Sequence, residues 1–414
     1  MTNTFKIKYI REFCQVIDCE HKTAPYVEKS DFLVVRTSNV KDGRLIWDDM
    51  KFTTQNGYEE WTQRAIPEYG DVLFTREAPA GETCLVPKDI KMCMGQRMVL
   101  LRPASEKIDP LFFSLVLASE KIKLDILKLS IGSTVSRINI EDIKQLKVPV
   151  PSLDEQRKIS KILNAWEQAI LTTEKLLANS QQQKKALMQQ LLTGKKRLLD
   201  DNGTRFSEIW GLYALSKLFQ RVTTKNNGKS TNVVTISGQH GLIKQEDFFK
   251  KTVASDTLDG YFLLKKGQFA YNKSYSNGYP MGAIKRLNQY PEGVVTTLYI
   301  CFELSTPKES FGDYWEHYFE SGLLNNSLSQ IAHEGGRAHG LLNVKPSDFF
   351  SLKVPVPGFE EQQKIAAVLS AADAEISTLE KKLTCLKEEK KALMQQLLTG
   401  KRRVKVDAEE AVSA

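Results

Sequence analysis

Two short segments of this chain resemble motifs that bind phosphate or metal, but each lacks a residue that its chemistry requires. Gly228-Lys229-Ser230 would end a phosphate-binding loop, yet Thr223 stands where that loop needs its first glycine. His333-Glu334 would begin a zinc-binding HExxH helix, yet Arg337 takes the place of the second histidine. The sequence also contains no GxGxxG dinucleotide motif. We therefore expect a non-catalytic chain with no metal site and no cofactor of its own.

The charge balance favours a polyanionic partner. Lysine and arginine exceed aspartate and glutamate by 58 − 50 = 8, and the sequence pI is about 8.9. With 414 residues, the chain exceeds the roughly 250 to 300 residues at which a single hydrophobic core stops growing. Its 41% hydrophobic and 26% charged residues are typical of globular proteins. We expect two or three folded domains.

Neither a disulfide framework nor a membrane segment is expected. The cysteines are scattered without a CxxC pair or clustered histidines, which favours reduced thiols and argues against a zinc site. They are Cys14, Cys19, Cys84, Cys93, Cys301 and Cys385. No run approaches the roughly 18 apolar residues of a membrane span, and the first residues lack the apolar stretch of a secretory signal. We expect a cytoplasmic protein.

The sequence repeats itself. Residues 146–198 match residues 352–404 at 30 of 53 positions without a gap, at an offset of 352 − 146 = 206 residues. The identical segments are LKVPVP at Leu146–Pro151 and Leu352–Pro357, and KALMQQLLTGK at Lys185–Lys195 and Lys391–Lys401. The chain is therefore a tandem duplication.

A different module precedes each repeat. Module 1 (residues 1–145) and module 2 (residues about 205–351) share little sequence but a similar outline. Each has a strand-like run after a glycine turn, Gly70–Arg76 in module 1 and Gly267–Lys273 in module 2. This layout indicates one scaffold that carries two different recognition modules.

Each repeat predicts a long helix. Each repeat starts with a proline-rich exit segment, Val148–Pro151 in the first copy and Val354–Pro357 in the second. The helix that we expect after it contains about 40 residues without an internal proline or glycine, which corresponds to a length of roughly 60 Å. Apolar residues recur at steps of three and four, the spacing of a coiled-coil seam. In the second copy they are Ile365, Leu369, Ala372, Ile376, Leu379, Leu383, Leu386, Leu393 and Leu397. Lys390 interrupts this seam, and Thr173, Ser180 and Lys184 interrupt the first copy. Gly194 and Gly400 are placed to cap the two helices.

The connection between the repeats favours an antiparallel pair of helices. The first helix leads from module 1 to module 2, and the second helix starts at module 2. The two seams meet most simply if the helices run in opposite directions. The modules would then be related by a pseudo-twofold axis.

A VPxPxxxEQxxI pattern occurs twice, and each time the long helix that ends in LLTGK follows it. Its residues are Val148, Pro149, Pro151, Glu155, Gln156 and Ile159, and again Val354, Pro355, Pro357, Glu361, Gln362 and Ile365. In this pattern the sequence resembles the specificity (S) subunits of type I restriction-modification systems. The resemblance covers essentially the whole chain.

The resemblance implies an α+β protein. Two target recognition domains of mixed α/β architecture would be separated by two long antiparallel coiled-coil helices with internal pseudo-twofold symmetry. The implied boundaries are 1–150 for the first recognition domain, 151–199 for the central helix, 200–357 for the second recognition domain, and 358–414 for the C-terminal helix and tail.

The resemblance also implies partners. Each recognition domain would bind one half of a bipartite, asymmetric site in double-stranded DNA, and the helices would set the spacer between the halves. The chain would dock two methyltransferase (M) subunits, which methylate adenine at N6 with S-adenosylmethionine. Two restriction (R) translocase-nuclease subunits, which use ATP and Mg, could join them. No cofactor would be held by this chain itself.

Candidate DNA-binding residues are cationic, amide, hydroxyl and aromatic side chains of the modules, since such groups contact phosphates and base edges. In module 1 they are Arg36, Ser38, Asn39, Lys41, Arg44, Arg64, Arg76, Ser133 and Arg137. In module 2 they are Lys225, Lys229, Gln239, His240, Lys244, Asn272, Lys273, Tyr275, Arg337 and His339. The densest group is YNKSYSNGY at Tyr271–Tyr279. A solvated surface charge is the competing interpretation for each of them.

For partner docking the repeated leucines Leu187, Leu191, Leu393 and Leu397 are candidates, and packing of one helix on the other is the competing interpretation. Trp47, Trp61, Trp210 and Trp315 are assigned to cores because large aromatic residues usually fill them. Two other functions remain open. One is a stand-alone DNA modification enzyme, and the other is a coiled-coil scaffold that does not recognise DNA.

Overall fold

The computed structural model describes residues 5–130, 137–238, 240–249, 257–334 and 342–406. The chain forms two compact units. Unit 1 contains residues 1–174 and 381–414, and unit 2 contains residues 175–380. This division cuts each long helix, because each half of a helix packs with the module of its own unit. In the described residues no helix is long and apolar enough to cross a membrane.

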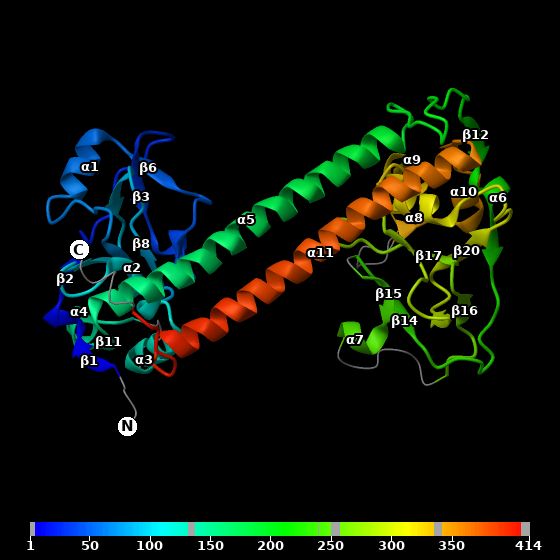
Figure 1. Ribbon diagram of the computed structural model, residues 1–414. Coiled ribbons are helices and arrows are strands. Elements are labelled where there is room, and N and C mark those ends of the chain that lie inside the picture. Colours follow the sequence, from blue (N-terminus) through cyan, green and yellow to red (C-terminus); the bar gives the residue numbers. More distant parts are fainter. Residues whose placement is uncertain (1–4, 131–136, 239, 250–256, 335–341, 407–414) are drawn as a thin grey trace. The chain divides into compact units, whose positions relative to one another are not determined.

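Unit 1 is built on two small sheets (Figure 1). One is antiparallel with strand order β2-β10-β7-β8, and the other has order β6-β3-β9 with a parallel β3–β9 pair. The strands are β1 (Lys6–Tyr9), β2 (Cys14–Asp18), β3 (Phe32–Val35), β4 (Val40–Lys41), β5 (Arg44–Leu45), β6 (Lys51–Thr53), β7 (Val72–Thr75), β8 (Thr83–Leu85), β9 (Lys91–Met94), β10 (Met98–Pro103) and β11 (Lys147–Val150). The helices are η1 (Ile10–Glu12), η2 (Thr37–Asn39), α1 (Gln55–Trp61), α2 (Pro110–Leu117), α3 (Glu120–Ser130), α4 (Ile140–Gln145) and the first part of α5 (Leu153–Leu191).

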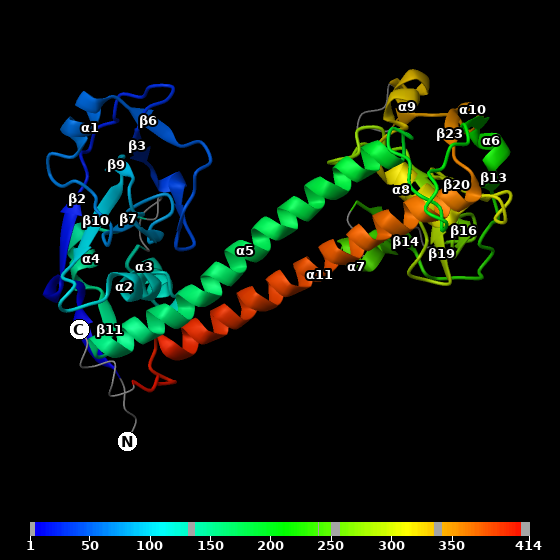
Figure 2. The same cartoon turned by 45° about the horizontal axis from the view of Figure 1, so that its top comes forward.

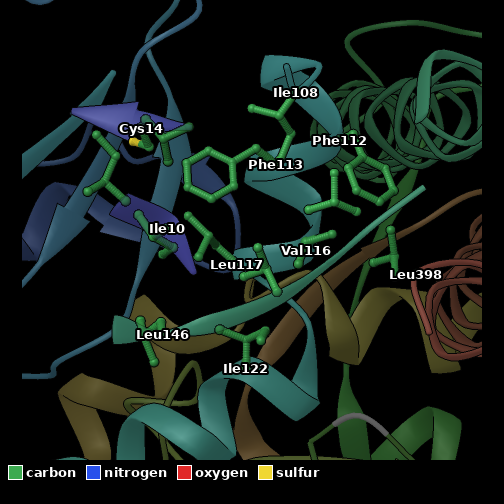
Figure 3. Packing of buried hydrophobic residues seen from close by; sticks show 14 of the residues in the cluster. Ile10, Cys14, Ile108, Phe112, Phe113, Val116, Leu117, Ile122, Leu146 and Leu398 are labelled. Carbon is green, nitrogen blue, oxygen red and sulfur yellow. The ribbon is translucent and has the colours of Figure 1, made fainter. Parts of the chain in front are cut away.

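Helix α2 supplies much of the core of unit 1. Asp109 caps it by accepting a hydrogen bond from the amide of Phe112, and Pro110 occupies the first turn, where no amide donor is needed. Figure 3 shows the α2 side chains Phe113 and Leu117 beside Ile10. Leu398, which follows α11, joins the same core. The end of the repeat is therefore part of the module's hydrophobic core.

Unit 2 has a corresponding antiparallel sheet, with strand order β13-β20-β17-β18. Its strands are β12 (Gly211–Ala214), β13 (Phe219–Val222), β14 (Val234–Ser237), β15 (Gly241–Lys244), β16 (Phe262–Lys265), β17 (Phe269–Asn272), β18 (Ala283–Arg286), β19 (Glu292–Val295), β20 (Ile300–Leu304), β21 (His333–Glu334), β22 (Leu342–Asn343) and β23 (Lys353–Val356). Its helices are α6 (Leu215–Leu218), α7 (Gln245–Phe249), α8 (Gly312–Glu320), α9 (Asn325–Ile331), α10 (Pro346–Ser351) and the first part of α11 (Phe359–Leu397). The strands predicted within Gly70–Arg76 and Gly267–Lys273 are confirmed as β7 and β17.

Aromatic side chains fill the core of unit 2. Phe219, Phe302 and Trp315 are buried and meet edge to face, with ring centroids 5.2 Å apart for the pairs Phe219–Phe302 and Phe219–Trp315. The core placement of Trp315 and Trp61 is confirmed, and Trp210 packs at the edge of the core. The core placement of Trp47 is wrong, because this residue is 56% exposed. Residue size alone does not show which way a loop side chain points.

Both long helices end as predicted. Helices α5 and α11 each span 39 residues, and Gly194 and Gly400 follow them with φ of +69° and +74°. This left-handed conformation closes a helix and favours glycine because it has no Cβ. Figure 2 shows the end of α11 beside the start of α5 in unit 1. Residue numbers rise along one helix as they fall along the other in the ion pairs Glu167–Lys390 and Glu174–Lys387, so these parts are antiparallel.

Candidate nucleic-acid interface

The first group of candidates in unit 1 lies on one braced segment, residues 36–49. Asn39 is fully buried, and its amide donates to the backbone oxygens of Ile46 and Asp48 at 3.1 Å each. Arg36 donates to the backbone oxygen and the carboxylate of Asp49, at 2.5 and 2.9 Å. Arg36 and Asn39 therefore hold the segment in shape.

The same segment presents other groups to solvent. Ser38 and Lys41 are exposed. Trp47, predicted from the sequence to lie in a core, is also exposed here, between the two residues that Asn39 braces. No local pattern marks Trp47 as a surface residue, because the bracing hydrogen bonds depend on how residues 36–49 fold back on themselves.

Arg44 lies against helix α5. Its Nε is 2.5 Å from Oε1 of Glu167, and its Nη1 is 3.0 Å from Oε2 of Glu174. Burial alone would lower the pKa of the guanidinium, but the two carboxylates raise it, so the arginine stays charged. The side chain predicted to contact DNA thus fastens module 1 to its helix.

A second group of arginines surrounds the end of β2. Arg76 is buried, and its Nη1 lies 3.0 Å from a carboxylate oxygen of Asp18. Arg64 donates to the backbone oxygen of Cys19 at 3.0 Å, and exposed Arg137 pairs with Glu77 at 3.3 Å. Arg97 pairs with Glu77 as well, at 3.2 Å. Sequence reasoning missed Arg97, since nothing in its spacing marks it.

The structure brings together one group that could hold a metal among the described residues, namely Asp18, Cys19 and His21. Their ligand atoms lie within 4.8 Å of one another. From the sequence we expected no metal cluster, because no cysteines are paired. A search for paired cysteines does not detect a group such as this one, in which an aspartate, a cysteine and a histidine lie within four residues. The guanidinium of Arg76 contacts both carboxylate oxygens of Asp18, and its positive charge opposes a cation there.

The aromatic segment Tyr271–Tyr279 of unit 2 lies beside the turn between β14 and β15. The hydroxyl of Tyr279 donates to the backbone oxygen of Gly238 at 3.0 Å, and Nζ of Lys285 donates to the same oxygen at 2.9 Å. Tyr275 is 64% exposed. The two segments therefore form one surface, to which the turn contributes exposed His240.

The remaining candidates of unit 2 differ in their surroundings. Lys273 is half-buried and donates to the backbone oxygen of Val344, and burial, followed by the charge of Arg221, lowers its pKa. Asn272 accepts a hydrogen bond from the amide of Ser274. Lys225, Lys229 and Lys244 have exposed side chains. Ser133, Gln239, Arg337 and His339 lie outside the described residues.

The repeated Glu-Gln pair of the sequence pattern joins each helix start to the other helix's end. Glu155 forms a bidentate ion pair with Arg403, which follows α11, at 2.6 Å for both contacts. Glu361 binds Arg197, which follows α5, in the same way at 2.6 and 2.7 Å. All four partners keep the 206-residue offset, since 361 − 155 = 403 − 197 = 206.

The glutamines of the pattern connect each helix to its module. The side-chain oxygen of Gln156 accepts from the amide of Asp109 at 2.7 Å, and that of Gln362 accepts from the amide of Phe311 at 2.9 Å. Each glutamine also donates to a proline oxygen of the exit segment, Pro151 or Pro357, at 2.9 Å. The pattern that carried the resemblance is therefore a buried structural joint.

The docking leucines divide into two kinds. Leu191 and Leu397 are buried in the cores of units 2 and 1, so they present no surface to a partner. Leu187 and Leu393 are only partly buried at the edges of those cores. Packing, the competing interpretation, accounts for Leu191 and Leu397. Docking stays a prediction for Leu187 and Leu393.

Unit 2 contains a cavity of about 530 Å³ beside α8 and α11. Within its lining, Nε2 of His317 is 2.9 Å from Oγ of Ser370, and Nδ1 is 3.7 Å from Asp373. These three side chains do not form an activated nucleophile, because Ser370 lies inside a continuous helix and Nδ1 is beyond hydrogen-bond distance of the acid. Asp373 is instead bound by Lys184 at 2.5 Å. We assign the group to packing.

Comparison with known proteins gives consistent matches. Residues 3–179 and 217–388 match the family described as the type I restriction modification DNA specificity domain. The specificity subunit described for the type I restriction enzyme MjaX of Methanocaldococcus jannaschii is 25% identical, with 97% of this chain and 94% of the relative covered. The MjaVIII specificity subunit of the same organism is 26% identical, with 82% and 81% covered.

A solved structure has the same fold. The type I restriction-modification S subunit from M. genitalium aligns with a TM-score of 0.60 at 14% identity, covering 96% of this chain and 97% of the other. A chain from a study of assembly of the type I system aligns with a TM-score of 0.53 at 16% identity, covering 97% and 99%. The mixed α/β fold expected from the sequence is confirmed.

Proposed function

This chain belongs to the family of type I restriction-modification DNA specificity subunits, and from that premise we propose that each of its modules binds one half of a bipartite DNA site. The observation that carries the proposal is the pairing of two unlike modules with one repeated joint, Glu155–Arg403 in unit 1 and Glu361–Arg197 in unit 2. An asymmetric, two-part target requires two different modules, and the equivalent joints attach both modules to the helices in the same way.

We further propose that α5 and α11 form an antiparallel coiled coil and relate the modules by a pseudo-twofold axis. The matching sheets and the 206-residue offset between equivalent contacts support this arrangement. The strand pairs β1–β11 and β12–β23 support it as well, because each joins a module's start to the exit segment of its repeat. The helices would then set the spacer between the half-sites.

The chemistry belongs to partner subunits in this proposal. Specificity subunits of type I systems work with methyltransferase (M) and restriction (R) subunits. We propose that two M subunits, which use S-adenosylmethionine, dock on this chain, and that two R subunits with ATP and Mg can join. The phosphate-binding and metal-binding motifs of the sequence are incomplete, which supports a chain that recognises DNA and leaves catalysis to its partners.

DNA binding with and without the M subunit tests the proposal. The isolated chain should bind random duplexes with an affinity that falls steeply as salt rises, because phosphate contacts release counterions. Adding the M subunit should further raise the affinity for duplexes that contain the recognition sequence. Binding of S-adenosylmethionine by the isolated chain would instead favour a stand-alone enzyme. Absence of any DNA binding by the complex would favour a scaffold.

A further inference from the structure

The seams of both long helices contain a lysine where an apolar residue is expected. Lys184 of α5 and Lys390 of α11 occupy equivalent positions, since 390 − 184 = 206. The two lysine side chains are only 17% and 18% exposed. An ammonium group that is largely buried loses hydration and needs a partner, so these lysines destabilise the helix pair unless a fixed acid faces each of them.

Each lysine meets such an acid on the facing helix. Nζ of Lys390 is 2.5 Å from Oε2 of Glu167 in unit 1, and Nζ of Lys184 is 2.5 Å from Oδ1 of Asp373 in unit 2. The acids are also equivalent, since 373 − 167 = 206. The two copies therefore share the lysine and have an acid at the facing position, which is glutamate in unit 1 and aspartate in unit 2.

Each acid also lies beside its recognition module. In unit 1, Arg44 of β5 forms an ion pair with Glu167 at 2.5 Å. In unit 2, His317 of α8 is hydrogen-bonded to Ser370 of α11 at 2.9 Å and lies 3.7 Å from Asp373, beyond hydrogen-bond distance. We call Arg44, Glu167 and Lys390 junction 1, and Lys184, His317 and Asp373 junction 2. Each junction joins two helices and one module.

The electrostatics of junction 1 show that its acid remains ionised. Burial alone would raise the pKa of Glu167, but hydrogen bonds from Lys390 and Arg44 lower it below its ordinary value. Burial would likewise raise the pKa of the neighbouring Glu174, but Lys387 and Arg44 lower it. Glu167 is thus held as a carboxylate between a helix and a module.

Stability alone does not explain these pairs. Glu167 and Lys390 are both 18% exposed, and replacing such a buried ion pair by well-packed apolar residues is often neutral or stabilising. Asp373 is 46% exposed, so its pair with Lys184 is partly screened by solvent. A polar group in a coiled-coil seam, by contrast, fixes the register of its helices. A slip by one heptad would move each lysine about 10 Å along the helix and separate it from its acid. An all-leucine seam would carry no such penalty for slipping.

We propose that the two junctions fix the axial register of α5 against α11 and the seat of each module on that pair, and so select one spacer length in the DNA. This inference rests on the proposed function. The groups act as positioning residues, because they hold the modules and need not touch DNA themselves.

The test uses the full chain with its methyltransferase subunit and a library of sites whose half-sites are constant and whose spacer varies in length. The variant E167L/K390L/K184L/D373L removes both ion pairs together, so that neither partner of a pair is left charged in the seam. K185L/K382L is the matched control, because it removes exposed lysines from the same two helices. Circular dichroism shows that each variant has folded.

The wild-type complex and the control should methylate one spacer at least about tenfold faster than its neighbours, and the junction variant should lose most of that preference. Charge exchange at junction 2 provides a rescue. K184E should broaden the preference, and K184E/D373K should restore it. A folded junction variant that keeps the wild-type preference would overturn the inference. A wild-type complex without sequence selectivity would instead refute the proposed function.

Discussion

The cysteines show how burial sets residue chemistry. Five of the six thiols are buried, and desolvation raises the pKa of Cys84, Cys93 and Cys301 to about 12. Only the thiolate is an effective nucleophile, so these residues should be inert in the folded chain. All six cysteines are free in the structure, and their reduced state stays a prediction.

Thiol titration with Ellman's reagent should therefore find one reactive cysteine, Cys385, in the native chain. The charge and hydrogen bond of Glu389 raise its pKa, so it should react more slowly than a free cysteine. The other five should react only after unfolding. C385S is the control and should show no reactive thiol, and rapid reaction of two or more thiols would contradict the burial of the other five.

His317 gives a pH prediction. Burial is the largest effect and lowers the pKa of His317 from the ordinary 6.5. The charge of Asp373 raises this pKa, Lys184 lowers it, and Asp313 and Glu320 raise it, but the net shift is downward. The unfolded state therefore binds a proton at higher pH than the folded state. The free energy of unfolding should fall as pH is lowered through about 6.5, by at most about 1.4 kcal/mol per pH unit for one proton.

Denaturant unfolding between pH 5 and 8 measures this dependence. H317N should flatten the slope, because asparagine keeps a polar group near Ser370 but does not titrate. An equal slope in wild type and H317N would show that other groups cause the dependence.

Among the secondary-structure elements, the joint at each helix start accounts for the repeated Glu-Gln pattern. Glu361 is buried, receives two hydrogen bonds from Arg197 and also accepts from Nε1 of Trp210 at 2.9 Å. Gly194 lies against the same indole, because a Cβ on this glycine would be 3.5 Å from the ring atoms of Trp210. In unit 1, Phe5 lies against Gly400 and Arg403 in the corresponding way. The pattern therefore encodes a contact between helix ends.

R197A should lower the free energy of unfolding by about 3 kcal/mol, because it leaves the carboxylate of Glu361 buried without its cation. R157A is the control, since Arg157 is 53% exposed and pairs with Asp154 on the surface, and it should cost less than about 1 kcal/mol. R197M/E361L should recover most of the loss. An equal effect of R197A and R157A in urea unfolding would contradict the joint's structural role.

For the molecule as a whole, the separation of modules from scaffold predicts exchangeability. Replacing residues 1–145 by the corresponding module of another family member, with an arginine kept at the position of Arg44 so that junction 1 stays intact, should alter one half-site and leave the other half and the spacer unchanged. The strand pair β1–β11 tolerates exchange because its backbone hydrogen bonds do not depend on side chains. Methylome sequencing of cells that carry the chimera provides the readout. A change in both half-sites would refute modular recognition.

Local patterns in the chain were sufficient to predict the duplication, the two long helices and their glycine caps, because periodicity and turn chemistry are local properties. The repeated pattern also led to the family. The same patterns could not assign Arg44, Asn39 and Arg76 to structural roles, because a cation or amide has the same local signature whether it faces solvent or an internal acid.

Which groups meet was decided by packing in three dimensions. Glu167 and Lys390 are far apart along the chain, and neither residue type says that the other lies 2.5 Å away. The exposed position of Trp47 likewise depends on hydrogen bonds that Asn39 makes after the segment has folded. Contacts between residues distant in sequence depend on how elements pack, and a local pattern does not specify that packing.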